Sequence, residues 1–299
     1  MKGYPDKKVR DDASQKNQTF KKLIGEIILN LGYPYLHWGL RMDRPLLPLL
    51  LFCIVILCMI AAGCTTAQQG NQTPAPASVT GSMTSITAAG KTYPAYIAAP
   101  ALPGTYPGIV LLHSFNGLEP GYKVMIDRIA TDGFTVIAPE WQTYGRQAGD
   151  PEVEAVVRSS VAALQARPDT DASKIGLTGF CAGGRFTMLF LPQIGDLKAG
   201  VAFYGFPYSR GNTNNTTPAE HISELTDPLL IIHGSRDQPS PINGIYNYTK
   251  ELDAADKYFE LKVYQGKPHG FMLVNGTLAK DTVAEDAYTQ MISFFRRML

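Results

Sequence analysis

Short apolar segments alternate with amphipathic segments from residue 82 to the end of the chain. Residues 82–99 form two alternating polar and apolar stretches around Ala89-Gly90, which predicts a β-hairpin. Further strands are predicted at 108–113, 134–139, 174–179, 199–206, 228–233 and 259–264. Helices are predicted at 119–132, 152–166, 184–191, 242–255 and 283–299. Because strands alternate with helices, we expect one α/β domain at residues 82–299, with a mostly parallel sheet covered by helices on both faces.

A run without charged side chains, residues 46–63, precedes this domain. Its length is at the lower limit for a membrane-spanning helix and also suits the apolar core of a signal peptide. Ile-Ala-Ala-Gly stands directly before Cys64, which resembles the cleavage site of a prokaryotic lipoprotein, whose cysteine carries the lipid. An uncleaved signal anchor and a buried core helix are the alternatives. If the run is a lipoprotein signal or an uncleaved signal anchor, we expect residues 65–299 on the extracytoplasmic side of the cell membrane.

The charges divide the chain in the same way. Residues 1–45 contain nine Lys/Arg and five Asp/Glu, a net charge of +4, whereas residues 65–299 carry a net charge of −3. The total of +1 gives no electrostatic reason to expect nucleic acid as a partner. Residues 1–45 are either a real basic extension or, because Met42 is a suitable start, largely untranslated. The segment 65–81, rich in Thr, Gln, Pro and Ser, predicts a flexible linker.

The sequence Gly-Phe-Cys-Ala-Gly-Gly at 179–184 lies between a predicted strand and a predicted helix. It matches the sharp turn G-x-nucleophile-x-G, with cysteine where serine usually stands. Larger side chains at the glycines would collide with the strand and the helix, and the helix N-terminus would favour the thiolate. We therefore expect Cys181 to be a nucleophile and the amide of Ala182 to form half of an oxyanion hole. The alternative is a buried structural cysteine.

The partners of such a nucleophile follow it along the chain as acid and then base. Asp237 comes shortly after the strand at 228–233, and His269 comes shortly after the strand at 259–264. The carboxyl ends of parallel strands are where open α/β sheets place their sites. We expect His269 to take the proton of Cys181 and Asp237 to orient the imidazole. The alternatives are a turn aspartate and a loop histidine, and we expect His113 and His233 to be structural.

Residues 82–299 resemble the dienelactone hydrolase family of α/β-hydrolases. The resemblance is carried by the stretches LLHSFNGLEPGYKVMIDRIATDGFTVIAPE, YGRQAGDP, GFCAGGRF, FYG, IIHGSRDQPSP and KPHGF. It implies an α/β-hydrolase fold and a catalytic triad of Cys181, Asp237 and His269. It also implies hydrolysis of a small ester or lactone through a thioester intermediate, with no metal or organic cofactor.

The chain departs from the family pattern at two positions. Ser114 stands where the family often has a glutamate that interacts with the resting thiol. Arg146 matches one of two arginines that hold the carboxylate of dienelactone, but the second would fall near Leu273 and is missing. The missing arginine argues against activity on dienelactone itself. Arg185 could instead contact an anionic substrate, or could be a surface residue of its helix.

The remaining candidates surround the predicted nucleophile. The loop after the strand at 108–113 would supply the second oxyanion donor, from the amide of Phe115 or of Ser114. Aromatic side chains at strand ends could line a substrate pocket or belong to the core. The candidates are Phe115, Trp141, Tyr144 and Tyr204.

Three functions fit these patterns. The first is a membrane-tethered carboxylic ester or lactone hydrolase. The second is a thiol acyltransferase or peptidase, although residues 208–226 are the one candidate insertion and are too short for a large lid. The third is a catalytically idle α/β-hydrolase fold that serves as a surface binding lipoprotein.

Overall fold

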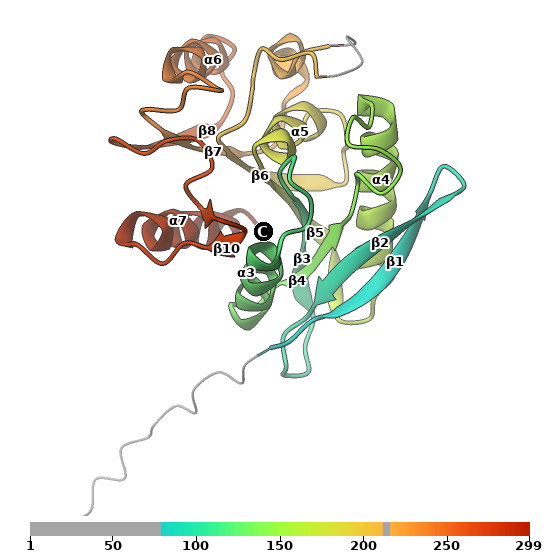
Figure 1. Ribbon diagram of the computed structural model, residues 1–299. Coiled ribbons are helices and arrows are strands. Elements are labelled where there is room, and N and C mark those ends of the chain that lie inside the picture. The colour runs from blue at the N-terminus through green and yellow to red at the C-terminus, as the bar shows by residue number, and fades with distance from the viewer. Residues whose placement is uncertain (1–78, 212–215) are drawn as a thin grey trace, which may run out of the picture. The chain divides into compact units, whose positions relative to one another are not determined.

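The computed structural model describes residues 79–211 and 216–299, which contain a central sheet between two layers of helices (Figure 1). The strands of the sheet are β1 (Ser82–Ala88), β2 (Lys91–Ala98), β3 (Tyr106–Leu112), β4 (Thr135–Pro139), β5 (Thr170–Phe180), β6 (Leu197–Phe203), β7 (Leu229–Gly234) and β8 (Phe259–Tyr264). Their order is β1-β2-β4-β3-β5-β6-β7-β8. Strand β2 runs antiparallel to both of its neighbours, and the other pairs are parallel. The mostly parallel sheet of an α/β-hydrolase fold is therefore confirmed.

Five helices cover the two faces of this sheet in the described part of the chain. They are α3 (Pro120–Thr131), α4 (Asp150–Gln165), α5 (Ala182–Phe190), α6 (Ile242–Ala254) and α7 (Thr282–Met298). Helices α3 and α7 lie on one face, and α4, α5 and α6 lie on the other (Figure 1). Each layer buries its own apolar cluster against the sheet, because strands covered on both faces have apolar side chains on both.

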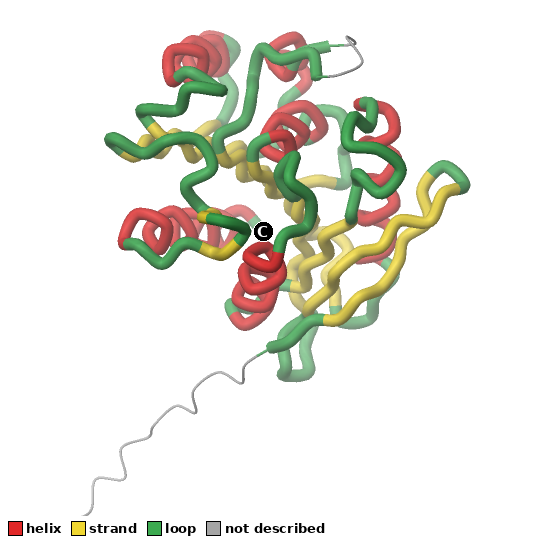
Figure 2. Tube along the Cα trace, in the orientation of Figure 1, coloured by secondary structure: helices red, strands yellow, loops and turns green. Residues whose placement is uncertain are grey.

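The central strands position the site. In β3, Ile109 to Leu112 are fully buried, so this strand is held on both faces and its carboxyl end is fixed in place. Strand β5 pairs with β3 on one side and β6 on the other, and its end lies beside theirs. The loops that follow these strands gather at the face seen in Figure 2, where they are drawn in green. The parallel arrangement thus collects loops from distant parts of the chain.

The predicted elements appear with small shifts at their ends, but a few elements were not predicted. A short 3-10 helix covers Pro218–Glu224. A two-stranded hairpin is formed by β9 (Leu273–Val274) and β10 (Thr277–Leu278). Two-residue strands are too short to show an alternating pattern, which explains why hydrophobic periodicity does not reveal them.

The β9–β10 hairpin packs on the start of helix α3. The amide of Gly121 donates to the carbonyl of Gly276 at 2.8 Å. A Cβ atom at Gly121 would lie 2.7 Å from the backbone nitrogen of Leu278, so only glycine permits this approach. The contact fixes the hairpin beside the loop that joins β3 to α3.

The predictions for the basic extension, the hydrophobic run, Cys64 and residues 65–78 of the linker lie outside the described residues, and the domain boundary at residue 82 stays a prediction. Within the described residues, none of the helices combines the length and the hydrophobicity that a membrane crossing requires.

Candidate active site

Cys181 lies at the tip of a tight turn between β5 and α5. Its backbone has φ 57° and ψ −113°, a conformation that is strained for a residue with a side chain. Its amide donates to the carbonyl of Phe203 at 3.1 Å, which ties the turn to the end of β6. Cys181 is partly buried and stands immediately before the first residue of α5. The strand, the turn and the helix therefore hold the sulfur at the carboxyl edge of the sheet, as the sequence predicts.

The flanking glycines are needed for steric reasons. A Cβ atom at Gly179 would lie 2.1 Å from the carbonyl oxygen of Gly183. A Cβ atom at Gly183 would lie 2.1 Å from the carbonyl oxygen of Leu112 in the neighbouring strand β3. Both contacts are with backbone atoms, which cannot turn aside as a flexible side chain could. The collision expected from the sequence pattern is therefore present in the structure.

Asp237 and His269 meet at the carboxyl ends of β7 and β8. Nδ1 of His269 lies 2.7 Å from Oδ2 of Asp237, whose side chain is fully buried. The other oxygen of Asp237 accepts the amide of Ser240 at 2.8 Å. Since both carboxylate oxygens are engaged, the carboxylate has a fixed orientation and fixes that of the imidazole.

The two loops that carry this pair are joined by their backbones. The amide of Arg236 donates to the carbonyl of Lys267 at 3.0 Å. A Cβ atom at Gly234 would lie 2.3 Å from the same carbonyl oxygen, so glycine is required where the loops touch. The Asp237–His269 contact thus depends on backbone packing that brings together positions 32 residues apart.

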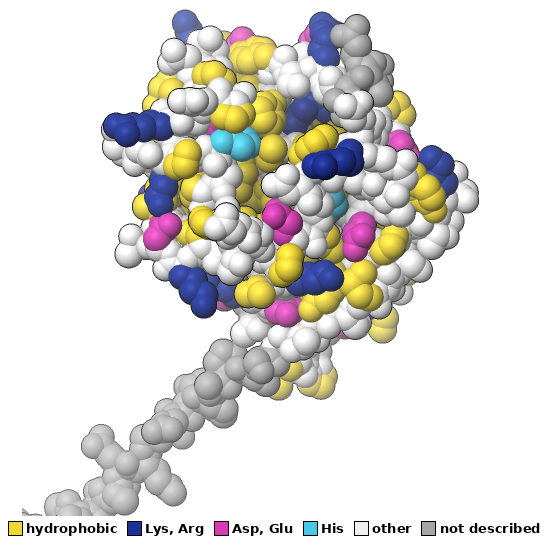
Figure 3. Space-filling view, viewed as in Figure 1, with side chains coloured by type: hydrophobic (Ala, Val, Ile, Leu, Met, Phe, Trp, Pro, Cys, Tyr) yellow, Lys and Arg dark blue, Asp and Glu magenta, His cyan; other side chains and the backbone are white. Residues whose placement is uncertain are grey.

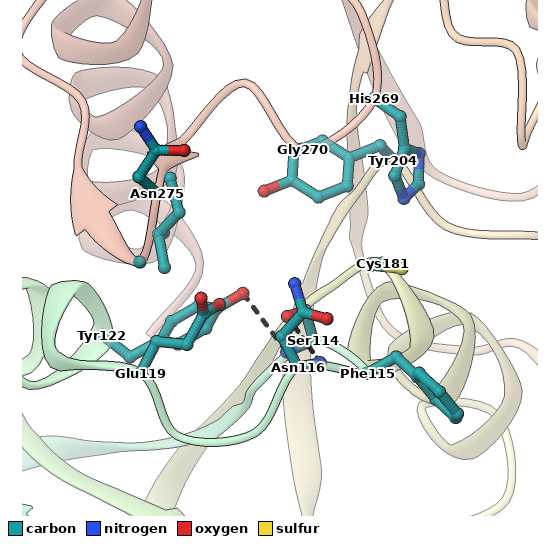
Figure 4. Close-up of a pocket in the computed structure, with 12 residues that line it drawn as sticks. Ser114, Phe115, Asn116, Glu119, Tyr122, Cys181, Tyr204, His269, Gly270 and Asn275 are labelled. Atoms are coloured by element: carbon teal, nitrogen blue, oxygen red, sulfur yellow. Dashed lines mark hydrogen bonds between the residues drawn. The ribbon is translucent and has the colours of Figure 1, made fainter.

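The electrostatics of His269 point to a charged imidazole. Burial alone would lower its pKa, but the hydrogen bond to Asp237 and the negative charges of Asp237 and Cys181 outweigh burial and raise the pKa to about 9. The Nε2 atom is buried and has no hydrogen-bond partner of standard geometry among the described residues. Figure 4 shows the imidazole above Cys181, with the thiol as its neighbour across the site. The structure therefore brings Cys181, Asp237 and His269 together.

Two backbone amides near Cys181 are available to hold an oxyanion. Among the described residues, the amides of Ala182 and Phe115 have no acceptor. The amide of Ser114, the alternative donor, is instead directed to the hydroxyl of Tyr122 at 3.2 Å. Of the two candidates in this loop, Phe115 is therefore the one left free to act.

A cleft of about 470 Å³, here called the larger cleft, opens beside the triad residues. It is lined by Ser114, Glu119, Tyr122, Cys181, Tyr204 and His269, together with Leu273, Asn275 and Gly276 of the hairpin region. In Figure 4, Glu119 and Asn275 lie on the side of this cleft opposite Cys181. The hydroxyl of Tyr204 also points into it, and the Tyr204 ring contacts that of His269 at 5.0 Å between centroids. The predicted pocket residues Ser114 and Tyr204 are thus in place.

A second cleft of about 240 Å³, here called the smaller cleft, also borders Cys181. Its surface is mostly apolar, with the aromatic rings of Phe115, Trp141, Phe186 and Phe206, and Asp150, Arg185 and Ser209 also line it. Cys181 and Phe115 line both clefts. The space-filling view of the same face shows hydrophobic side chains recessed near its centre, with histidine beside them (Figure 3). The thiol therefore stands where a polar space and an apolar space meet.

Arg185 does not act as a free cation in the smaller cleft, which corrects the sequence-based expectation. It is 3% exposed, and its two terminal nitrogens each lie 2.8 Å from an oxygen of Asp150. Its Nε donates to the carbonyl of Ser209 at 2.7 Å. A buried guanidinium with these partners holds α5, the start of α4 and the loop after β6 together. The sequence could not show this pairing, because Asp150 is 35 residues away.

Tyr144 and Arg146, which the sequence suggests as substrate-binding residues, do not line either cleft. Tyr144 is 53% exposed and lines neither cleft, and its hydroxyl donates to the carbonyl of Thr92 at 2.9 Å. Arg146 is exposed, and its guanidinium lies over the ring of Phe115 at 4.9 Å. Tyr144 is therefore not a pocket residue in this structure, and Arg146 reaches the site only through Phe115.

Two further histidines are buried behind the site. His113 stacks on Trp141 at 5.0 Å, and burial lowers its pKa to about 4, so it is neutral. Nε2 of His233 lies 2.8 Å from the carbonyl of Ser240 and 3.5 Å from Asp237. Burial also lowers the pKa of His233. Both agree with the structural role that the sequence indicates, and His233 in addition supports the segment that holds Asp237.

Sequence reasoning did not find Glu119, Tyr122 and Asn275 as residues of the site. Glu119 and Tyr122 were assigned only to a helix, and nothing in the helical pattern distinguishes a residue that faces a cleft. Asn275-Gly276 is a strong hairpin signal that could have indicated a turn here, since both residues have positive φ. Among the described residues, no group of three or more potential metal ligands is close enough to hold a metal ion.

Comparisons with known proteins identify the family. The model of the dienelactone hydrolase family matches residues 93–299. "Putative carboxymethylenebutenolidase" of Escherichia coli K12 is 30% identical over 76% of this chain and 90% of its own length. A "Probable 2-oxo-3-(5-oxofuran-2-ylidene)propanoate lactonase" of Bradyrhizobium is 23% identical over 68% of this chain and 88% of its own length.

A solved structure agrees with these matches. The "Putative Dienelactone Hydrolase" of Klebsiella pneumoniae has a TM-score of 0.67 and 26% identity, and the match covers 73% of this chain and 99% of that one. The region that the family model matches contains the turn at Cys181 and the Asp237–His269 pair. The chain is a member of the dienelactone hydrolase family, with the α/β-hydrolase fold.

Proposed function

We propose that this protein hydrolyses carboxylic esters or lactones with Cys181 as nucleophile, His269 as acid and base, and Asp237 as the residue that orients His269. One observation carries the proposal. The imidazole is fixed by Asp237 at 2.7 Å on Nδ1, while Nε2 has no hydrogen-bond partner of standard geometry in the described chain and faces the thiol. A base oriented on one side and free on the other is what proton transfer to a reacting group requires.

The chemistry follows from this geometry. With His269 charged, the thiolate of Cys181 attacks the carbonyl carbon, and the carbonyl oxygen becomes an oxyanion. The amides of Ala182 and Phe115 are the donors available to it. The carbon–oxygen bond to the alcohol then breaks as Nε2 of His269 gives its proton to the leaving oxygen, which leaves a thioester on Cys181.

The thioester is cleaved in a second step. Nε2 of His269, now without its proton, accepts one from water as the water oxygen attacks the thioester carbon. The same two amides hold the second oxyanion. The carbon–sulfur bond then breaks, the acid is released, and the thiolate and imidazolium of Cys181 and His269 are restored. No metal ion or organic cofactor takes part in either step.

The names of the relatives favour the same reaction class, since a butenolidase and a lactonase open cyclic esters. The test uses the full chain in detergent with p-nitrophenyl butyrate, which reports ester cleavage by colour. The wild type should hydrolyse p-nitrophenyl butyrate, and the hydrolysis rate of Cys181→Ala should be lower by at least about a thousandfold. Tyr144→Phe, at an exposed ring outside both clefts, is the matched control and should keep full activity.

Other outcomes would refute the assignment. Full activity in Cys181→Ala, with the same thermal unfolding as wild type, would show that another group is the nucleophile. An inactive wild type that binds esters without turnover would point to an idle fold that serves as a binding protein.

We also propose that the N-terminal segment holds this domain on the outer side of a membrane through a lipid on Cys64. The support is the sequence alone, in which an uncharged run ends in small residues before Cys64. Expressed in a bacterial host, the wild type should occur in the membrane fraction with Cys64 as its lipid-bearing N-terminus. Cys64→Ser should keep its uncleaved N-terminus. A wild type recovered in the soluble fraction with unmodified Cys64 would contradict the proposal.

A further inference from the structure

The thiol of Cys181 stands between two clefts of different character. This implies an ester whose acyl part and alcohol part, here called its acyl arm and alcohol arm, differ in polarity. The smaller cleft is bounded by Trp141, Phe186 and Phe206. Its charged groups, Arg185 and Asp150, satisfy each other through two hydrogen bonds of 2.8 Å. This cleft therefore offers an incoming group apolar contact and little else.

The larger cleft is more polar than the smaller one. Glu119 is the carboxylate that lines it, together with hydroxyl and amide groups of Tyr122, Tyr204, Asn116 and Asn275. No lysine or arginine is among its described lining residues. The positive charge of His269 in this cleft is paired with Asp237 at 2.7 Å, whereas the charge of Glu119 is not paired. A carboxylate brought close to Glu119 would therefore be repelled, and a cation would be attracted.

Glu119 is held in place without using its charge. It precedes helix α3, yet its side chain makes no capping hydrogen bond to that helix. It forms no ion pair within the described chain, and Lys123, one turn further on, lies over the ring of Tyr96 at 5.6 Å instead. A Cβ atom at Gly276 would lie 3.1 Å from Oε1 of Glu119, so the hairpin packs against the carboxylate. The carboxylate therefore faces the cleft with its charge unpaired (Figure 4).

The chemistry of the triad decides which arm lies in which cleft. The leaving alcohol oxygen must lie within hydrogen-bond reach of Nε2 of His269, because that atom gives it a proton. His269 lines the larger cleft and not the smaller one. The alcohol arm therefore extends into the larger cleft, beside Glu119, and the acyl arm extends into the smaller, aromatic cleft.

We propose that Glu119 is a specificity-determining residue, and that the preferred substrates are open-chain esters of a short apolar acid with an alcohol that carries a cationic group. The inference rests on the proposed ester hydrolysis and narrows its substrate class. It predicts that substrates with a carboxylate on the alcohol arm are disfavoured.

Three butyrate esters that differ in charge at one position test this proposal. The first is butyrylcholine, and the second is 3,3-dimethylbutyl butyrate, its neutral isostere with carbon in place of nitrogen. The third is 4-(butyryloxy)butanoate, which carries a carboxylate. Hydrolysis of all three by the full chain is followed as acid release in a pH-stat, and kcat/KM is measured at low ionic strength, where charge interactions are least screened.

The wild type should prefer the cationic ester over its neutral isostere by at least about tenfold, and the neutral ester over the anionic one by a similar factor. Glu119→Gln keeps the size of the side chain and removes its charge, so both ratios should fall to about one. Glu154→Gln, which removes a carboxylate on α4 that pairs with Arg158, is the matched control and should leave both ratios unchanged.

The outcomes separate the two proposals. If all three esters are hydrolysed with ratios that are the same in wild type and Glu119→Gln, the role of Glu119 is wrong and the ester hydrolysis stands. If Glu119→Gln loses activity on all three esters equally, Glu119 is not a specificity residue. If wild type hydrolyses none of the three esters nor p-nitrophenyl butyrate, the proposed function itself fails.

Discussion

Replacing Arg185 by methionine distinguishes a structural role of this residue from a role in substrate binding. The exposed fractions of the Arg185 and Asp150 side chains are 4% and 9%, so solvent screens their interaction very little. Arg185→Met would leave the carboxylate of Asp150 buried and without its two hydrogen bonds of 2.8 Å. Breaking a buried pair in this way costs about 3–5 kcal/mol. For a domain of this size that corresponds to a fall in Tm of roughly 6–20 °C.

The assay is thermal unfolding by calorimetry, with urea unfolding as a second measure, on wild type, Arg185→Met and the double variant Arg185→Met/Asp150→Leu. The double variant removes both charges and should recover most of the lost stability, because no unpaired charge remains buried. Arg146→Ala, at an exposed arginine, is the control and should change the Tm by no more than about 2 °C. A Tm of Arg185→Met equal to that of wild type, together with a tenfold higher KM for an anionic ester, would refute the structural role and restore the binding role.

Three further predictions concern the turn and the triad. Gly179→Ala places a Cβ atom 2.1 Å from a backbone carbonyl oxygen, so it should lower the free energy of unfolding in urea by about 1–3 kcal/mol or more. Gly195→Ala is the control: the space around Gly195 is open, and the free energy of unfolding should change by less than about 0.5 kcal/mol. The raised pKa of His269, about 9 against an ordinary 6.5, stabilises the folded state fully below about pH 6.5, and this stabilisation is lost as the pH rises through 9. The stability difference between wild type and His269→Gln should therefore be larger at pH 6 than at pH 10, and an equal difference at both would contradict the raised pKa. Asp237→Asn should lower kcat for p-nitrophenyl butyrate by about a thousandfold to ten thousandfold without unfolding the domain, because the imidazole loses its orienting carboxylate.

The fold and the turn at Cys181 could be predicted because their signals are local. Buried parallel strands have continuous apolar runs, and the succession of strands and helices determines the layers. The glycines around Cys181 are local as well, since each is required by contacts with the adjacent strand and helix. The placement of Asp237 and His269 followed from the rule that the carboxyl ends of parallel strands share one edge, and the structure brings the pair to 2.7 Å.

The walls of the clefts could not be predicted in the same way. Arg185 pairs with Asp150 through a contact that no local pattern records, so the sequence suggests a substrate contact or a surface position where the structure has a buried, paired arginine. Glu119 faces the larger cleft because the β9–β10 hairpin, more than 150 residues further along the chain, closes that side. Tyr144 follows a strand end, as Trp141 does, but its ring packs edge-on against Tyr93 at 5.1 Å and is directed away from the site. Contacts between distant segments thus decide which polar and aromatic side chains reach the substrate.

The strain and the unpaired group at the site favour catalysis over the idle binding alternative. Holding Cys181 at φ 57° costs about 1–3 kcal/mol, since this conformation suits glycine and not cysteine. A buried imidazole nitrogen without a standard hydrogen bond, as at Nε2 of His269, costs about 1–3 kcal/mol more. The structural histidines His113 and His233 each have such a nitrogen as well, but neither lines a cleft, whereas His269 lines the larger one beside the strained Cys181. Both features lie where, in the proposed mechanism, the thiolate attacks and the proton moves, which favours catalysis over the binding alternative.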